Sequence, residues 1–261
     1  MKLAANLSLL YPGLPMAQRI EAAAQDGFEG VEILAPYDME PEALAALLRA
    51  HGVKLVLINT PLGPNGEKGL ASLPGREAEF EAGLRQAFAV CQATGCRAIH
   101  VMAGQVPEGG DRAQHEATLI ANLRHMAPVA AQAGITLTLE ALNRQDVPHY
   151  FYYVADQAVE ILQAVDHPAV RLQFDFYHSQ REKLDLNGTL QRLLPWVHHV
   201  QFAHVEGRHE PDPTDPAVAA ALETLVQAGY PGWIGCEYTP AGDPHEGLKW
   251  RDAYHALVRR P

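Results

Sequence analysis

Four short apolar segments in the second half of the sequence each end on a side chain that carries oxygen. These side chains are Glu140, Asp175, Gln201 and Glu237. Carboxylates are disfavoured in buried strands unless something pairs with them, so a shared cation would explain the set. Three carboxylates and an amide carbonyl form an all-oxygen group that suits Mg²⁺ or Mn²⁺ rather than structural zinc. The pattern predicts a metal-dependent enzyme.

The two outer members of this set, Glu140 and Glu237, could approach a substrate from opposite sides. Two carboxylates that flank a metal-polarised hydroxycarbonyl group can shuttle a proton through an enediolate. One carboxylate removes the α-proton, and the other returns a proton to the neighbouring carbon. The predicted chemistry is therefore the isomerisation of a small hydroxy-carbonyl compound.

The elements that must position these side chains alternate between β-type runs and Ala/Leu-rich helical runs. Strands are expected at residues 3–7, 30–34, 53–59, 98–103, 135–140, 170–175, 197–202 and 233–237. Helices are expected at residues 16–26, 41–51, 76–94, 113–133, 154–165, 186–193, 217–228 and 245–257. This strict alternation predicts an α/β fold, a closed (β/α)8 TIM barrel that forms a single domain over residues 1–261.

A doubly wound open sheet is the alternative architecture. It would normally place a glycine-rich phosphate turn after the first strand, and residues 6–11 contain no glycine. In a barrel, the four oxygen-bearing residues end strands five to eight, on the face where barrel enzymes place their chemistry. Adjacent strands lie about 4.8 Å apart, so four consecutive strand ends can surround one ion.

Three further residues are candidates for substrate contact. Asn59 and His100 end the third and fourth expected strands on the same face. For His100, a satisfied core histidine is the alternative. Arg76 follows a Pro-Gly pair and could bind a substrate carboxylate with two hydrogen bonds, or could be a charge in the first helical turn.

Composition limits the classes of partner. The net charge of −11 disfavours a nucleic-acid surface, which needs clustered Lys and Arg. The three cysteines form neither a disulfide framework nor a zinc pattern. The sequence shows no basic-then-apolar leader and no apolar run of about 18 residues, so we expect a cytoplasmic protein with a small-molecule substrate and no membrane partner.

Several short motifs, spread over nearly the whole chain, occur in a distinctive order. They are Ala5-Asn-Leu-Ser8, Gly27-Phe-Glu-Gly-Val-Glu32, Pro74-Gly-Arg-Glu-Ala-Glu-Phe80, Leu139-Glu-Ala-Leu-Asn143, Gln173-Phe-Asp-Phe-Tyr-His-Ser-Gln180, His199-Val-Gln-Phe-Ala203 and Gly235-Cys-Glu-Tyr238. Each motif is weak alone, but their order and spacing together resemble the hydroxypyruvate isomerase family. That family lies among the xylose isomerase-like barrels.

This resemblance implies an enzyme that interconverts hydroxypyruvate and tartronate semialdehyde with Mg²⁺ or Mn²⁺. The metal ligands that it implies are Glu140, Asp175, Gln201 and Glu237. It also implies that Glu140 and Glu237 are the catalytic pair, and that His178 and Arg208 lie near the substrate. A homo-oligomer is implied in the same way.

Two departures from the family pattern leave the substrate open. Residues 204–211 lack the Gly-Thr-Gly-Glu run of the isomerases, and Thr239 stands where relatives tend to have lysine. The alternative reactions are isomerisation of a four-carbon 2-oxo acid and 3-epimerisation of a ketose, although Gln201, where epimerases carry histidine, favours the isomerase branch. An abasic-site endonuclease and a non-catalytic sugar-binding or assembly barrel are the alternative functions.

Overall fold

The strands close into a barrel. The computed structural model describes residues 1–259. Within these residues, eight parallel strands pair in chain order and the last pairs with the first, so the sheet has no free edge. The strands are β1 (Lys2–Asn6), β2 (Gly30–Ile33), β3 (Lys54–Asn59), β4 (Ala98–His100), β5 (Thr136–Glu140), β6 (Val170–Asp175), β7 (Val197–Phe202) and β8 (Trp233–Cys236). The predicted TIM barrel is confirmed.

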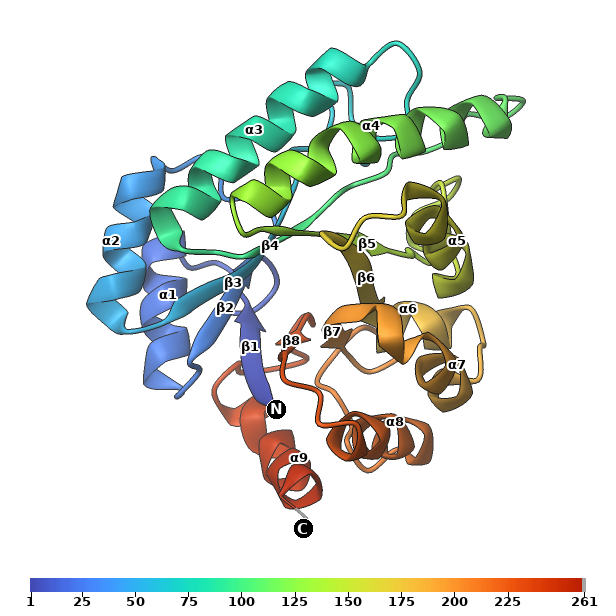
Figure 1. The fold of residues 1–261 in the computed structure, drawn as a ribbon. Coiled ribbons are helices and arrows are strands. Elements are labelled where there is room, and N and C mark those ends of the chain that lie inside the picture. The colour runs from blue at the N-terminus through green and yellow to red at the C-terminus, as the bar shows by residue number, and fades with distance from the viewer. Residues whose placement is uncertain (260–261) are drawn as a thin grey trace.

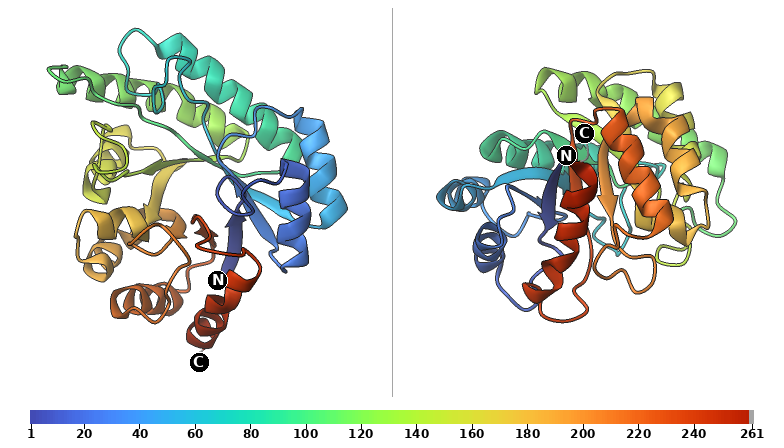
Figure 2. Two further views of the ribbon diagram at one scale, coloured as in Figure 1. Left: turned by 180° about the vertical axis from the view of Figure 1, so that it is seen from behind. Right: turned by 90° about the horizontal axis from the view of Figure 1, so that it is seen from below.

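Helices form a ring outside the strands (Figure 1), and they remain outside in the two other views (Figure 2). The α-helices are α1 (Met16–Gln25), α2 (Pro41–His51), α3 (Glu77–Thr94), α4 (Arg112–Gln132), α5 (Ala155–Val165), α6 (Phe176–Arg181), α7 (Leu186–Leu193), α8 (Pro216–Gln227) and α9 (Trp250–Val258). Short 3₁₀ turns lie at Leu194–Trp196 and Glu246–Lys249. No helix in the described part of the chain is both long enough and apolar enough to cross a membrane.

The helices follow from local sequence signals. Helix α5 buries Ala158, Ile161, Leu162 and Val165, whose spacing of three, one and three residues places them on one face against the barrel. Helix α6 was not predicted. It begins directly after Asp175, whose carboxylate accepts hydrogen bonds from the backbone N–H groups at the start of that helix.

Strand β4 is shorter than predicted. Val101 N–H still donates to the Thr138 carbonyl oxygen of β5 at 2.9 Å, but residues 102 and 103 pair with a different segment. The carbonyl oxygen of Ala103 accepts a hydrogen bond of 2.8 Å from Ser72 N–H, in the long connection between β3 and α3. The backbone of that connection passes so close that a Cβ atom on Gly69 would lie 2.1 Å from the Met102 carbonyl oxygen. Residues 69–72 are thus fixed to the barrel, which limits how far the preceding part of the connection can move.

The apolar core lies between the barrel and the helices, whereas the middle of the barrel itself is polar. Its buried inward side chains include Asn6, Glu32, Thr138, Gln173 and His199. Space for the Glu32 carboxylate exists because β8 has Gly235 at the facing position, where a Cβ atom would lie 2.1 Å from Glu32 Oε1. The barrel interior therefore differs from the branched aliphatic layers that fill most TIM barrels.

Candidate active site

A cavity of about 270 Å³ opens at the carboxyl ends of the strands. Six of the predicted site residues line it: Asn59, His100, Glu140, His178, Arg208 and Glu237. A larger cavity of about 670 Å³ lies at the opposite mouth of the barrel, beside Lys54 and Trp233 at the starts of β3 and β8, and none of the predicted site residues line it. Because barrel enzymes carry out their chemistry at the carboxyl ends of the strands, the smaller cavity is the candidate active site.

Three buried carboxylates occupy this end of the barrel. Glu140 and Asp175 end neighbouring strands, and Glu237 directly follows β8. Burial, with the nearby Glu237 and Asp175, raises the pKa of Glu140 well above its usual range. Burial also raises the pKa of Asp175, and it raises the pKa of Glu237 to about 8. The protein alone therefore provides too little positive charge to keep all three groups ionised.

Glu140 has one oxygen without a partner. Its Oε2 atom accepts a hydrogen bond of 2.9 Å from Gln173 Nε2, but its buried Oε1 atom has no hydrogen-bond partner within residues 1–259. A buried carboxylate oxygen with no donor is costly to maintain. The donor set and this atom together fit a divalent cation, which would supply the missing charge.

Arg208 is a positively charged side chain of the protein that lies among these acids. Its Nη2 atom lies 2.8 Å from Glu237 Oε1, and its guanidinium carbon lies 4.8 Å from the ring centre of Tyr177. Arg208 has a φ of 53°, and its carbonyl oxygen accepts a hydrogen bond of 2.9 Å from Thr239 N–H. The loop after β7 is thus tied to the segment after β8, and this tie holds Arg208 over the cavity.

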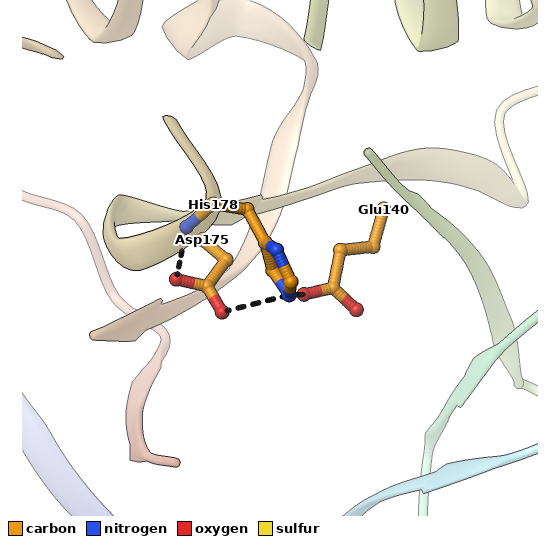
Figure 3. A group of neighbouring side chains, drawn as sticks. All are labelled: Glu140, Asp175 and His178. Atoms are coloured by element: carbon orange, nitrogen blue, oxygen red, sulfur yellow. Dashed lines mark hydrogen bonds and ion pairs between the residues drawn. The ribbon is translucent and has the colours of Figure 1, made fainter. Parts of the chain in front are cut away.

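His178 lies between two of the carboxylates (Figure 3). One atom from each of Glu140, Asp175 and His178 lies within 4.8 Å of the others, which is compatible with a shared metal ion. However, His178 Nδ1 accepts a hydrogen bond of 3.1 Å from the backbone N–H of Asn143, and a backbone N–H can only donate. Burial lowers the pKa of His178 well below its usual range, so the ring is neutral and carries its proton on Nε2. The nitrogen that faces the carboxylates is therefore a donor and lacks the lone pair that a metal needs.

Two other cavity residues present polar atoms without partners. His100 Nδ1 lies 3.1 Å from Glu140 Oε2, but not in hydrogen-bond geometry, and neither ring nitrogen has a hydrogen-bond partner in the described part of the chain. Burial lowers the pKa of His100 to about 3, so this ring is neutral. The buried Oδ1 atom of Asn59 also lacks a partner among the described residues. The ring nitrogens of His100 and the Oδ1 atom of Asn59 are therefore available to a ligand.

Comparison with known proteins identifies the family. The model of the xylose isomerase-like TIM barrel family matches residues 20–256. The chain belongs to this family. A human protein provisionally named a hydroxypyruvate isomerase is 46% identical over 97% of this chain and 95% of its own length. A protein of Haemophilus influenzae named 2-oxo-tetronate isomerase is 38% identical over 97% of this chain and 99% of its own length.

A solved structure from Brucella melitensis, titled AP endonuclease, family 2, is 39% identical, with a TM-score of 0.93 over 97% of this chain and 98% of that one. The curated relatives confirm the predicted family and, at the level of reaction class, the prediction of an isomerase. Both the three-carbon and the four-carbon reactions weighed from the sequence are represented among these names.

Within this xylose isomerase-like barrel, Arg76 lies apart from the cavity. Its guanidinium binds Glu67 Oε1 at 2.7 Å and Glu79 Oε2 at 2.7 Å, and it does not line the cavity. The cation from the same connection that does line the cavity is Lys68, which has no hydrogen bond or ion pair to any residue in 1–259. Sequence reasoning missed Lys68, because no motif distinguishes it from Arg76.

The hydrogen-bond partners of Gln201 and Gln173 are known only from the structure. Gln201 is fully buried, and its Oε1 atom accepts a hydrogen bond of 2.7 Å from Gln173 Nε2. Gln173 was not singled out from the sequence. The available signal was its position two residues before Asp175, because alternate residues of a strand share a face.

Proposed function

We propose that this chain is a metal-dependent isomerase that interconverts hydroxypyruvate and tartronate semialdehyde. One observation carries most weight: two buried glutamates, Glu140 and Glu237, line the same small cavity together with an arginine and two neutral histidines. The volume of the cavity suits a substrate with few carbons. The names of the curated relatives support the same reaction class.

The proposed metal ligands are Glu140, Asp175, Gln201 and Glu237, and the proposed ion is Mg²⁺ or Mn²⁺. Asp175 is suitable because only its Oδ1 atom caps α6, so Oδ2 remains available. His178 is left out of this set, because its Nε2 atom carries the proton. When bound, the cation polarises the substrate oxygens and stabilises the negative charge that develops on them.

The two glutamates are proposed to move the proton. Each has one oxygen held by the protein, since Gln173 donates to Glu140 Oε2 and Arg208 binds Glu237 Oε1. Glu140 can accept or return a proton at one carbon through the carboxylate oxygen that the cation leaves free, while Glu237 acts in the same way at the neighbouring carbon. The Nε2–H group of His178 can donate to a substrate oxygen, and Arg208 keeps Glu237 oriented.

A carboxylate on the substrate would find a cation at Lys68. Arg208 is already paired with Glu237, whereas Lys68 lines the cavity without a partner in residues 1–259. This favours a 2-oxo acid over a neutral ketose. A four-carbon 2-oxo acid is the second candidate substrate, because a relative of comparable identity is named 2-oxo-tetronate isomerase.

Solvent deuterium exchange tests the proposal. Hydroxypyruvate, a four-carbon 2-oxo acid and a ketose are each incubated in D₂O with purified protein and Mg²⁺, and the C2 and C3 protons are followed by NMR. We expect exchange and isomerisation with a 2-oxo acid, and loss of both in EDTA. The absence of exchange with all three compounds would contradict the proposed function, and nicking of abasic DNA by the same sample would favour an endonuclease instead.

A further inference from the structure

A continuous row of buried hydrogen bonds crosses the barrel interior from Glu32 to Glu140. Gln201 Nε2 donates to Glu32 Oε2 at 2.8 Å, and Gln173 Nε2 donates to Gln201 Oε1 at 2.7 Å. The same Gln173 nitrogen donates its second hydrogen to Glu140 Oε2 at 2.9 Å. These four side chains are at most 3% exposed. The row therefore has a carboxylate at each end, Glu32 and Glu140, and two amides between them.

Glu32 fixes the direction in which Gln201 points, and Gln201 in turn fixes the direction of Gln173. An ionised carboxylate only accepts hydrogen bonds, so Gln201 must turn its NH₂ group to Glu32 and its carbonyl oxygen to Gln173. The Gln201 oxygen that faces Gln173 only accepts, so Gln173 must turn its NH₂ group to Gln201, and the same NH₂ group also reaches Glu140 Oε2. Thr138 Oγ1 lies 2.9 Å from the remaining Gln173 oxygen and satisfies it. If Gln201 alone were rotated by 180°, NH₂ would face NH₂ at one end and oxygen would face carboxylate at the other.

Glu32 is itself held in place. Its Oε2 atom also accepts a hydrogen bond of 3.0 Å from Asn6 Nδ2, and its Oε1 atom lies 2.5 Å from His199 Nε2. Glu32 is fully buried, and Gly235 leaves the space that its carboxylate occupies. A buried carboxylate with three donors has no freedom to turn away from Gln201. These contacts indicate a role for Glu32, a buried acid that does not line the cavity.

We propose that Glu32 and Gln173 are positioning residues that make Gln201 an oxygen donor for the metal ion. An amide offers either oxygen or NH₂ at almost the same shape, and only the oxygen can bind a cation. Glu32 draws the NH₂ group away, and Gln173 holds both the carbonyl oxygen of Gln201 and one oxygen of Glu140. This inference rests on the proposed metal site and assigns the residues that orient two of its ligands.

Metal affinity, measured without substrate, tests this role. We expect Glu32→Gln and Gln173→Met each to weaken Mn²⁺ binding by about tenfold or more, as the loss of partners behind metal ligands commonly does. Binding is measured by calorimetry and by the EPR signal of free Mn²⁺. In Glu32→Gln the new amide can donate to Gln201, so the direction of the row is no longer fixed, although its shape is kept.

The matched control is Asn122→Leu. Asn122 lies on α4, and its buried Nδ2 atom donates to the Ala71 carbonyl oxygen at 2.8 Å, far along the chain from the row. This variant loses a buried amide hydrogen bond of the same kind, so we expect a lower melting temperature with unchanged Mn²⁺ affinity. A purely structural role for Glu32 and Gln173 would give them the same result as Asn122→Leu.

The outcomes separate this inference from the proposed function. If wild-type protein binds no Mn²⁺, the proposed metal site is wrong and this role fails with it. If wild-type protein binds Mn²⁺ and the folded variants bind it within about twofold as tightly, only the positioning role is overturned. Should Gln173→Met fail to fold, Glu32→Gln, which keeps the volume of the side chain, decides the question alone.

Discussion

Arg208 Nη2 lies 2.8 Å from Glu237 Oε1, and this ion pair sits at the rim of a cavity that also holds Glu140. The pair joins the loop after β7 to the segment after β8. The positive charge of Arg208 also acts on Glu140 and Asp175, yet burial still raises the pKa of all three carboxyl groups. This deficit of positive charge supports the proposed divalent ion at this end of the barrel.

Replacing either glutamate with glutamine should abolish most of the proton transfer. We expect Glu140→Gln and Glu237→Gln each to lower kcat by about 10²–10⁴-fold, the usual size of a general acid or base effect. The measurement is the rate of substrate isomerisation and of deuterium uptake at C2 and C3. Retention of near-normal exchange in either variant would remove that residue from the proposed pair.

Lys68 should govern affinity for the substrate carboxylate and not the chemical step. We expect Lys68→Met to raise KM for a 2-oxo acid by about tenfold or more while kcat changes little, because a hydrogen bond to a charged group contributes about 1.5–3 kcal/mol. Arg76→Met is the matched control from the same connection, since Arg76 lies outside the cavity and binds Glu67 and Glu79. Equal effects of the two substitutions on KM would show that the cavity position of Lys68 has no special role.

Substitutions of His178 and Asp175 should have different effects, the first on substrate contact and the second on metal binding. In His178→Asn the new Oδ1 atom can accept the hydrogen bond from Asn143 N–H, so we expect Mn²⁺ affinity to change little while kcat/KM falls. Asp175→Asn should lower Mn²⁺ affinity strongly, because it removes a charged ligand. If His178→Asn instead lost the metal as completely as Asp175→Asn, the histidine would be a ligand and the proton assignment on its ring would be wrong.

The stability of the metal-free protein should decrease as pH rises toward 8. Burial raises the pKa of Glu237 from its usual 4.5 to about 8, so between these values the folded chain holds a proton that the unfolded chain has released. The resulting stabilisation is fully present below pH 4.5 and is lost as pH rises through about 8. Glu140 and Asp175, whose pKa values are also raised, act in the same direction.

Thermal unfolding in EDTA measures this effect as a difference between wild type and Glu237→Gln. Glutamine does not titrate, so the melting temperature of wild type relative to this variant should fall between pH 5 and pH 9. Groups that do not interact with Glu237 cancel in the difference. A difference that stays constant over this range would contradict the raised pKa of Glu237.

The sequence by itself determined the fold and the side chains that gather at the carboxyl ends of the strands. Parallel strands in a closed barrel share one direction, so Asp175 and Gln201, which lie near the carboxyl ends of successive strands, must become neighbours, and the strand register pairs them. The ordering of Glu140, Asp175 and Glu237 around the same rim follows from the same rule. Alternation along the strand also places Gln173 on the inner face, although its partners cannot be read from the pattern.

The tertiary structure decided which residues of separate loops line the cavity and which hydrogen-bond partners they have. Lys68 lines the cavity, whereas Arg76 is paired with Glu67 and Glu79 outside it. The residue after Lys68, Gly69, packs against the Met102 carbonyl oxygen, a contact between distant parts of the chain. The proton on His178 is placed by the backbone N–H of Asn143, which follows a different strand. Spacing fixes which face of a strand a residue occupies, whereas the direction of an amide or the tautomer of a ring is set by hydrogen-bond partners that only the folded chain brings together.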